Sequence, residues 1–113
     1  MICANLYYHN QVLWGFKIEG HSGYAEHGTD IICAAISVLV FNTVNSINEF
    51  TDEEVHIHKM DPEKGLFDCE FPKRKLQNSS EKAELLLNAM VLGLNTIEQT
   101  YGENYIKVKT NRR

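Results

Sequence analysis

The sequence predicts an α+β domain of two layers, in which a mostly antiparallel sheet carries two helices on one face in the order β-β-α-β-β-α-β. The clearest strand signal is the alternation of apolar residues from Val12 to Glu19, the period expected where one face of a strand packs on a core. The helix signals are an uninterrupted apolar run from Ile31 to about Asn48 and a regular apolar stripe after Asn78. Each helix follows two strand-like segments, which favours two layers.

The remaining strands are predicted from turn signals between short apolar segments. Ile2–Tyr8 precedes the clearest strand, and Asn10 suits the tight turn of a hairpin between the two. Glu54–Met60 and Leu66–Phe71 flank the sequence DPEKG, whose proline presets a turn dihedral and whose glycine tolerates a positive one. This spacing predicts a second hairpin, and Tyr105–Thr110 is predicted to be the last short strand.

Both helices have start signals in the sequence. Thr29 or Asp30 can cap the first helix, which is apolar on nearly all sides and is therefore expected to be buried on most of them. The second helix is predicted to begin near Asn78, with Glu81 at the spacing of a capping box, and to end at Gly102 in a left-handed conformation. Its predicted buried stripe consists of Ala83, Leu87, Met90, Leu94, Ile97 and Tyr101.

The 113 residues are predicted to form one domain, 1–113, because no linker interrupts them and a chain of this length can bury a core without disulfides. The net charge of −4 argues against a surface that binds nucleic acid throughout, so direct nucleic-acid binding is not expected. The basic tail is interpreted either as a solvated end or as a contact for RNA or an acidic partner: Lys107, Lys109, Arg112 and Arg113.

The N-terminal sequence and the cysteines indicate a cytoplasmic protein. No cationic segment leads into a long apolar run, and no stretch approaches the roughly 18 apolar residues of a membrane span, so no membrane partner is expected. Cys3, Cys33 and Cys69 form no C-x-x-C pair, and their odd number leaves at least one thiol free, as in a reducing compartment.

Cys33 is the candidate nucleophile and His21 the candidate base. With Thr29 or Asp30 as the cap, Cys33 falls in the first helical turn, where unpaired N–H groups and the helix dipole stabilise a thiolate. A strand, a loop and a helix can bring His21 to Cys33 at one edge of a sheet, where its imidazole would take the thiol proton and return it to a leaving amine. Alternatively, Cys33 is a small core residue and His21 serves the structure alone.

The glycine-rich segment between these two residues is interpreted as a mobile, substrate-binding flap, with an ordinary flexible loop as the alternative. His27 is a second possible base, but mobile backbone fixes a proton acceptor poorly, so His21 is preferred. The flap residues are Ser22, Gly23, Tyr24, Ala25, Glu26, His27, Gly28 and Thr29.

Asp30 and Ser37 are supporting candidates. Asp30 is favoured as the helix cap; as an alternative it orients His21, although its carboxylate beside the sulfur would oppose ionisation of the thiol. Ser37 follows Cys33 by four residues and so shares its helix face, where its hydroxyl bonds back to a carbonyl or lines the cleft.

The other histidines and cysteines are given structural interpretations. His56 and His58 share one face of a strand, but no third ligand accompanies them at a suggestive spacing, so a solvated face is preferred to a metal pair. No metal or other cofactor is expected. Cys3 and Cys69 alternate with apolar neighbours and are interpreted as core residues.

The stretch GHSGYAEHGTDIICAAIS resembles the signature of the ribosomal-processing cysteine protease family, called Prp, G-H-[AS]-G-x-A…G-x-D-[IL]-[IV]-C-A-[AG]-[VI]-S. The resemblance extends over essentially the whole chain in length and element order. It implies that Cys33 is the nucleophile and His21 the general base, that Gly20, Asp30 and Ser37 are further signature positions, and that the flap 22–29 orders over the peptide. Backbone N–H groups at the helix start are the candidates for an oxyanion hole.

The resemblance further implies a homodimeric cytoplasmic endopeptidase. Its substrate would be the large-subunit ribosomal protein numbered twenty-seven, which loses a short N-terminal extension after an aromatic residue during ribosome maturation. The alternative function is a non-catalytic ribosome-associated assembly factor that uses the basic tail and the flap. A redox sensor at Cys33 is a third hypothesis, disfavoured because no resolving cysteine lies close in the sequence.

Overall fold

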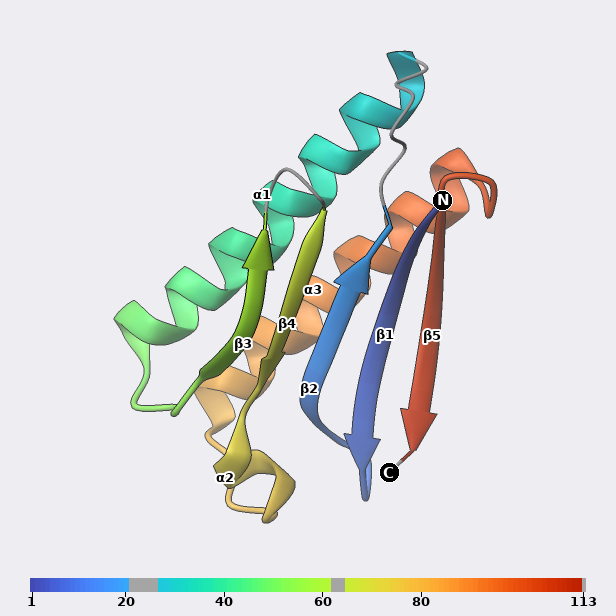
Figure 1. Cartoon of the computed structure of the whole chain (residues 1–113). Helices are drawn as coiled ribbons and strands as arrows, with labels where there is room; N and C mark the ends of the chain where they lie inside the picture. Colours follow the sequence, from blue (N-terminus) through green and yellow to red (C-terminus); the bar gives the residue numbers. More distant parts are fainter. Residues whose placement is uncertain (21–26, 62–64, 113) are drawn as a thin grey trace.

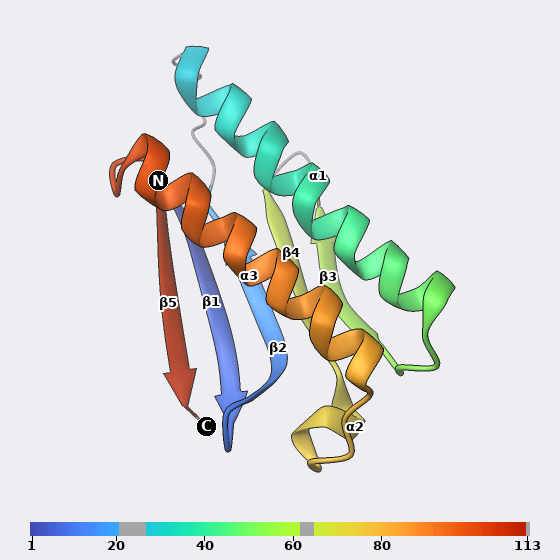
Figure 2. The same cartoon turned by 180° about the vertical axis from the view of Figure 1, so that it is seen from behind.

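The computed structural model describes residues 1–20, 27–61 and 65–112, with residues 27–30 described by their backbone alone. One sheet forms the first layer, and two long helices lie together on one of its faces as the second (Figure 1, Figure 2). In chain order the elements are β1 (Ile2–His9), β2 (Val12–Glu19), α1 (His27–Phe50), β3 (His56–Asp61), β4 (Leu66–Glu70), α2 (Pro72–Lys75), α3 (Glu81–Tyr101) and β5 (Ile106–Arg112).

The sheet confirms the predicted fold class. Its strands lie in the order β3-β4-β2-β1-β5, and every neighbouring pair is antiparallel except β1 and β5, which are parallel. Helix α3 runs back along the sheet before β5, and such a crossover is what a parallel neighbour requires. The short helix α2 was not predicted; it begins at Pro72, whose fixed φ suits a first helical position.

The predicted hairpin between β1 and β2 is confirmed. Asn10 and Gln11 form its two-residue turn with φ values of 47° and 67°, the left-handed pair that matches the twist of the flanking strands. The register shifts between Tyr7 and Tyr8. Near this bulge the ring of Trp14 stacks on that of Tyr7 at 5.4 Å between centroids, and Lys75 Nζ lies 4.2 Å from the Trp14 ring.

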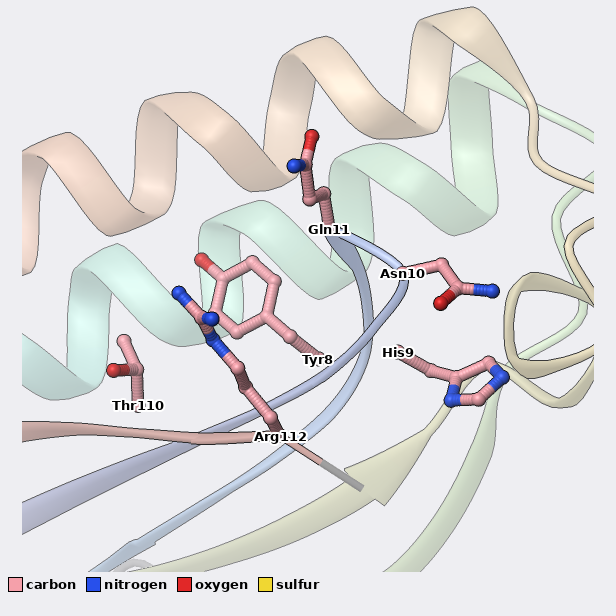
Figure 3. A pocket seen from close by; sticks show the side chains of 6 residues that line it. All are labelled: Tyr8, His9, Asn10, Gln11, Thr110 and Arg112. Carbon is pink, nitrogen blue, oxygen red and sulfur yellow. The ribbon is translucent and has the colours of Figure 1, made fainter.

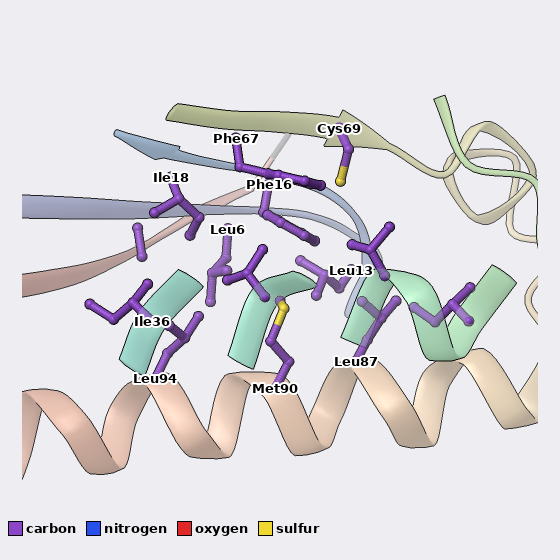
Figure 4. Close-up of a cluster of buried hydrophobic side chains, with 14 of the residues drawn as sticks. Leu6, Leu13, Phe16, Ile18, Ile36, Phe67, Cys69, Leu87, Met90 and Leu94 are labelled. Carbon is purple, nitrogen blue, oxygen red and sulfur yellow. The ribbon is translucent and has the colours of Figure 1, made fainter. Parts of the chain in front are cut away.

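The core lies between the sheet and the two long helices, and Figure 4 shows it in close-up. Cys69 is buried there at 1% exposure, as predicted. The prediction that Cys3 is a core residue is wrong. Ile2, Ala4 and Leu6 of β1 are buried against the helices, so the alternation of the strand turns Cys3 to the opposite face, where it is half-buried.

Helix α1 begins earlier and is less covered than predicted. It starts at His27, so Thr29 and Asp30 have helical backbone and neither is its N-cap. One stripe packs on the sheet, whereas Ile31 and Val38 on the outer side are 66% and 69% exposed, so burial on most sides is wrong. The buried stripe consists of Ile32, Ile36, Val40, Val44 and Ile47.

The segment Ile31–Phe50 is long and apolar enough, by length and composition alone, to cross a membrane. This corrects the expectation that no stretch approaches such a span. Core helices meet the same two conditions, and α1 packs a continuous apolar stripe against the sheet. We therefore interpret this segment as a core helix.

Helix α3 has a different cap from the one predicted. Ser80 is its N-cap, and the Ser80 hydroxyl accepts a hydrogen bond of 3.3 Å from the backbone N–H of Ala83, so the capping box from Asn78 is wrong. Gly102 ends the helix with φ 97° and ψ 163°, a conformation open to glycine but outside the left-handed helical region predicted for it. Gly93 packs against α1, since a Cβ there would lie 2.8 Å from the Leu39 side chain.

Candidate active site

Cys33 and Ser37 lie one turn apart on α1, and both side chains are half-buried. Cys33 packs against the edge of the core, next to the fully packed stripe that begins at Ile32. This position leaves part of the thiol accessible while the helix fixes its backbone. The shared face of Cys33 and Ser37 agrees with their four-residue spacing in the sequence.

The electrostatic setting of Cys33 differs from the predicted one. Because α1 starts at His27, Cys33 is the seventh helical residue, roughly 9 Å along the axis from the first. The dipole effect is concentrated in the first turn, so the predicted placement of Cys33 in that turn, on which its dipole activation was argued, is wrong. The Cys33 N–H also lies inside the helical ladder, so any oxyanion-hole donors from the helix start would come from His27–Asp30.

Gly20 is held tightly at the end of β2. Its φ is +119°, and a Cβ built there would lie 2.3 Å from the carbonyl oxygen of Met1 and 2.9 Å from the Ile2 Cα. No side chain fits this close approach of two backbones. Gly20 immediately precedes His21, and the end of β2 lies at the same end of the molecule as the start of α1 (Figure 1). Gly20 therefore has a fixed backbone position at the same end of the molecule as the start of the helix that carries Cys33.

His21 and the flap residues Ser22–Glu26 lie outside the described residues, so the pairing of His21 with Cys33 stays a prediction. The last three flap residues, His27–Thr29, have helical backbone at the start of α1, which shortens the predicted flap at that end. Asp30 also belongs to this first helical turn; its possible contact with His21 stays a prediction.

A small apolar depression of about 20 Å³ lies beside Ser37. It is bounded by the central strand β2, by the neighbouring strand β4 and by α1, so residues far apart in the sequence meet there. Phe41 stands edge-on to Phe67 with ring centroids 5.3 Å apart at its wall. The sequence did not predict this depression. Its only local signal is the four-residue spacing of Ser37 and Phe41, which does not show that two strands lie against the same helix face. Its lining is Ile18, Ile36, Ser37, Val40, Phe41, Gly65, Leu66 and Phe67.

The remaining histidines and cysteines lie away from this arrangement. His56 and His58 both lie on the edge strand β3, with Nε2 atoms 3.4 Å from Glu54 Oε2 and 3.3 Å from Glu70 Oε1, respectively. Among residues 1–20, 27–61 and 65–112 no group of three ligating side chains gathers for a metal. Burial raises the pKa of the Cys69 thiol, which keeps it protonated and unsuited to attack.

Comparison with known proteins finds one family of similar chains. Residues 1–107 match the sequence profile of the family described as cysteine protease Prp. The chain is 34% identical over 103 residues to the ribosomal processing cysteine protease Prp of Bacillus subtilis, covering 91% of this chain and 90% of the relative. It is 36% identical over 87 residues to the protein of the same name from Staphylococcus aureus, covering 77% of each.

Two solved structures are similar over nearly the full chain. A Streptococcus mutans protein has a TM-score of 0.85 at 29% identity and covers 100% of this chain and 96% of its own. The essential ribosomal processing protease Prp of S. aureus, solved in complex with a substrate peptide, has a TM-score of 0.84 at 27% identity and covers 98% and 100%. The sheet and both helices are thus shared with a peptide-binding relative.

Proposed function

Because the chain belongs to the family of Prp cysteine proteases, we propose that it is an endopeptidase in which Cys33 is the nucleophile and His21 the general base. The observation that carries the proposal is the placement of Gly20 and α1. Gly20, the residue before His21, is held at the end of the molecule where α1 starts. Helix α1 carries the accessible thiol of Cys33 beside an apolar depression. A base is needed, because the nucleophile that attacks a carbonyl is the thiolate and the thiol proton must be accepted by another group.

The proposed reaction has two steps. In the first, the Cys33 thiol proton passes to His21, Sγ attacks the scissile carbonyl carbon, and the proton is then delivered to the leaving amine as the C–N bond breaks. In the second, His21 takes a proton from water, the resulting hydroxide attacks the thioester, and the acid product leaves as the thiol is restored. Each step conserves the proton, and no cofactor takes part.

The proposed substrate is the N-terminal extension of the large-subunit ribosomal protein numbered twenty-seven, cut after an aromatic residue. The names of the relatives, which are ribosomal processing proteases, support this proposal, as does the substrate peptide bound in the S. aureus structure. The aromatic preference is supported by the apolar depression beside Ser37, walled by Phe41 and Phe67. Since about 20 Å³ is less than an aromatic ring needs, we expect its side chains to rearrange when the peptide binds.

The proposed setting is a cytoplasmic homodimer. All three cysteines are free, which is consistent with a reducing compartment. The outer sides of the two long helices expose large apolar side chains that a second copy would cover: Ile31, Val38, Leu85 and Leu92.

Intact mass spectrometry of the extended ribosomal protein tests the proposal. We expect the wild-type chain to release one N-terminal fragment and the variants Cys33→Ala and His21→Ala to release none. Cys3→Ala is the matched control, because it removes an equally half-buried thiol on the far face of the sheet and should retain activity. Cleavage by the Cys33→Ala variant would refute the nucleophile. An intact substrate that nevertheless stays bound to the wild-type chain would favour the non-catalytic assembly factor.

A further inference from the structure

A hollow of about 600 Å³ lies at the end of the sheet opposite to Gly20, formed by the β1–β2 hairpin and the end of β5. Strand β2 separates the two ends by eight residues, roughly 26 Å, so the hollow is remote from Cys33. Its volume is in the range of sites that hold a small organic ligand. The lining residues are Tyr8, His9, Asn10, Gln11, Thr110 and Arg112 (Figure 3).

The path of α3 explains why this corner is open. The helix crosses the sheet diagonally, from the start of β5 toward α2, and leaves the C-terminal ends of β1 and β5 uncovered (Figure 2). The parallel register places Tyr8 directly beside Arg112, and alternation puts Thr110 on the same helix-facing side. The strand pairing therefore places the side chains of Tyr8, Thr110 and Arg112 around the hollow.

The hollow gathers hydrogen-bond donors and a single positive charge. In Figure 3 the Arg112 guanidinium extends toward the Tyr8 ring, and Gln11 contributes a side-chain amide from the turn, whereas the amide of Asn10 points away from Tyr8 and Arg112. Among the residues that the structure describes, the side chains of Tyr8, Thr110 and Arg112 have no hydrogen-bond or ion-pair partner. Burial raises the pKa of Tyr8, so its hydroxyl remains a protonated donor near neutral pH.

None of the described residues that line this hollow has a carboxylate side chain, although the chain as a whole is acidic. Glu98 on α3 contacts β5, where its Oε2 accepts a hydrogen bond of 2.6 Å from the backbone N–H of Val108, four residues before Arg112. Within the described part of the chain, Arg112 therefore has no ion pair with a carboxylate. A guanidinium in a polar hollow of this kind suits a phosphate, which it can bind through two parallel N–H bonds.

We propose that this hollow binds a nucleoside phosphate, with the phosphate on Arg112 and the base against the Tyr8 ring. The hydroxyls of Tyr8 and Thr110 donate to further phosphate or ribose oxygens, and the amide of Gln11 faces the edge of the base. A peptide carboxylate would engage Arg112 alone and leave the aromatic ring and the Gln11 amide without a role. The nucleoside phosphate comes either from single-stranded RNA or from a free nucleotide.

The proposal is independent of the protease chemistry, because no lining residue belongs to the candidate active site. Its test is direct binding, measured by fluorescence anisotropy with a labelled eight-nucleotide single-stranded RNA and by calorimetry with AMP and with inorganic phosphate. Binding of the RNA alone identifies RNA as the source, and comparable binding of AMP identifies a free nucleotide. Inorganic phosphate is expected to bind more weakly than either.

Matched variants separate the hollow from general basicity. Arg112→Gln should weaken binding at least about fivefold and lower the salt dependence by about one counterion. Lys107→Gln removes the same charge from the same strand. Because side chains alternate along a strand, Lys107 lies on the other face of the sheet, and its loss should change affinity less than about twofold. Tyr8→Phe keeps the ring and removes the donor, so a partial loss is expected.

Three results would overturn the proposal: no binding of any probe by the folded wild-type chain, equal losses in the Arg112→Gln and Lys107→Gln variants, or tighter binding of an acidic peptide than of the RNA and AMP. Thermal melting of each variant confirms that it is folded before binding is compared. Cleavage of a short peptide substrate should be the same in the Arg112→Gln variant as in the wild-type chain.

Discussion

The Nε atom of Arg74 donates a hydrogen bond of 2.7 Å to the backbone carbonyl oxygen of Leu13, 61 positions earlier in the chain. The guanidinium is 1% exposed, and it also lies 3.4 Å from Glu84 Oε1 and 3.9 Å from Glu53 Oε1. One side chain on the short helix α2 thus connects β2, the segment after α1 and the first turn of α3. The cluster of Arg74, Glu53 and Glu84 therefore stabilises the end of the molecule that is opposite to Cys33.

Replacement of Arg74 by Met is expected to destabilise the fold strongly. The substitution preserves much of the volume but removes the partner of the Leu13 carbonyl and leaves the carboxylate of Glu53 buried without its cation, at a cost of about 3–5 kcal/mol. Urea denaturation measures the change. Lys73→Met is the matched control, since Lys73 is an exposed cation on the same short helix and should alter the unfolding free energy little. Equal effects of the two variants would contradict the role of the cluster.

Glu53 is expected to make stability fall as the pH rises above its ordinary pKa of about 4.5. Burial raises the pKa of Glu53 in the folded state, against the opposing charge of Arg74, so the folded chain retains this proton over a range in which the unfolded chain has lost it. Protonation is therefore linked to folding, and the favourable contribution disappears as the pH passes the folded pKa. Urea midpoints of the wild-type chain and of Glu53→Gln, compared from about pH 4 to pH 7, test this. The advantage of Glu53→Gln should grow with pH, and a constant difference would argue against it.

Two glycine substitutions separate steric conflict from backbone strain. Gly20→Ala meets both, because its φ is +119° and the new Cβ would lie 2.3 Å from the Met1 carbonyl oxygen. Gly102→Ala also adopts a positive φ, +97°, but its Cβ meets nothing within 4 Å. We expect about 1 kcal/mol of destabilisation for Gly102→Ala and a loss larger by about 1 kcal/mol or more for Gly20→Ala.

Thermal melting and peptide cleavage should be measured on both glycine variants. Gly20→Ala is expected to reduce kcat/KM even at temperatures where it is fully folded, because it displaces the residue before His21. Gly102→Ala should retain its activity. A fully active Gly20→Ala variant would show that the position of this backbone is unimportant for the site.

Local sequence patterns predicted most of the helices and strands, and particular residues show where these predictions failed. The strand Val12–Glu19 was predicted to the residue, because every second residue from Val12 to Ile18 is a large apolar one and a short turn precedes the strand. The start of α1 was missed, since Thr29 and Asp30 are strong caps by type but the backbone is already helical at His27. Cys3 was misplaced because apolar neighbours alone do not tell which face of a strand a residue occupies.

Tertiary contacts account for the rest of the differences. The sequence contains nothing local that marks Arg74 as buried, because its partners come from three other segments. The candidate site was predicted only in part for the same reason. The spacing of Cys33 and Ser37 placed them on one face, whereas Ile18 and Phe67 reach the neighbouring depression through strand pairing that no short motif encodes.

The depression beside Ser37 gives the last prediction, which depends on the proposed protease function. Ser37→Leu should fill the depression with little cost to the fold, since the Ser37 side chain is half-exposed. If an aromatic side chain of the substrate occupies this space, KM for a peptide with that residue should rise and kcat/KM should fall at least about tenfold, the loss expected when one apolar pocket is blocked. Val38→Leu enlarges the next residue on the same helix, which is 69% exposed, and should change kcat/KM less than about twofold. Equal kinetics for Ser37→Leu and Val38→Leu would mean that the substrate's aromatic residue binds elsewhere.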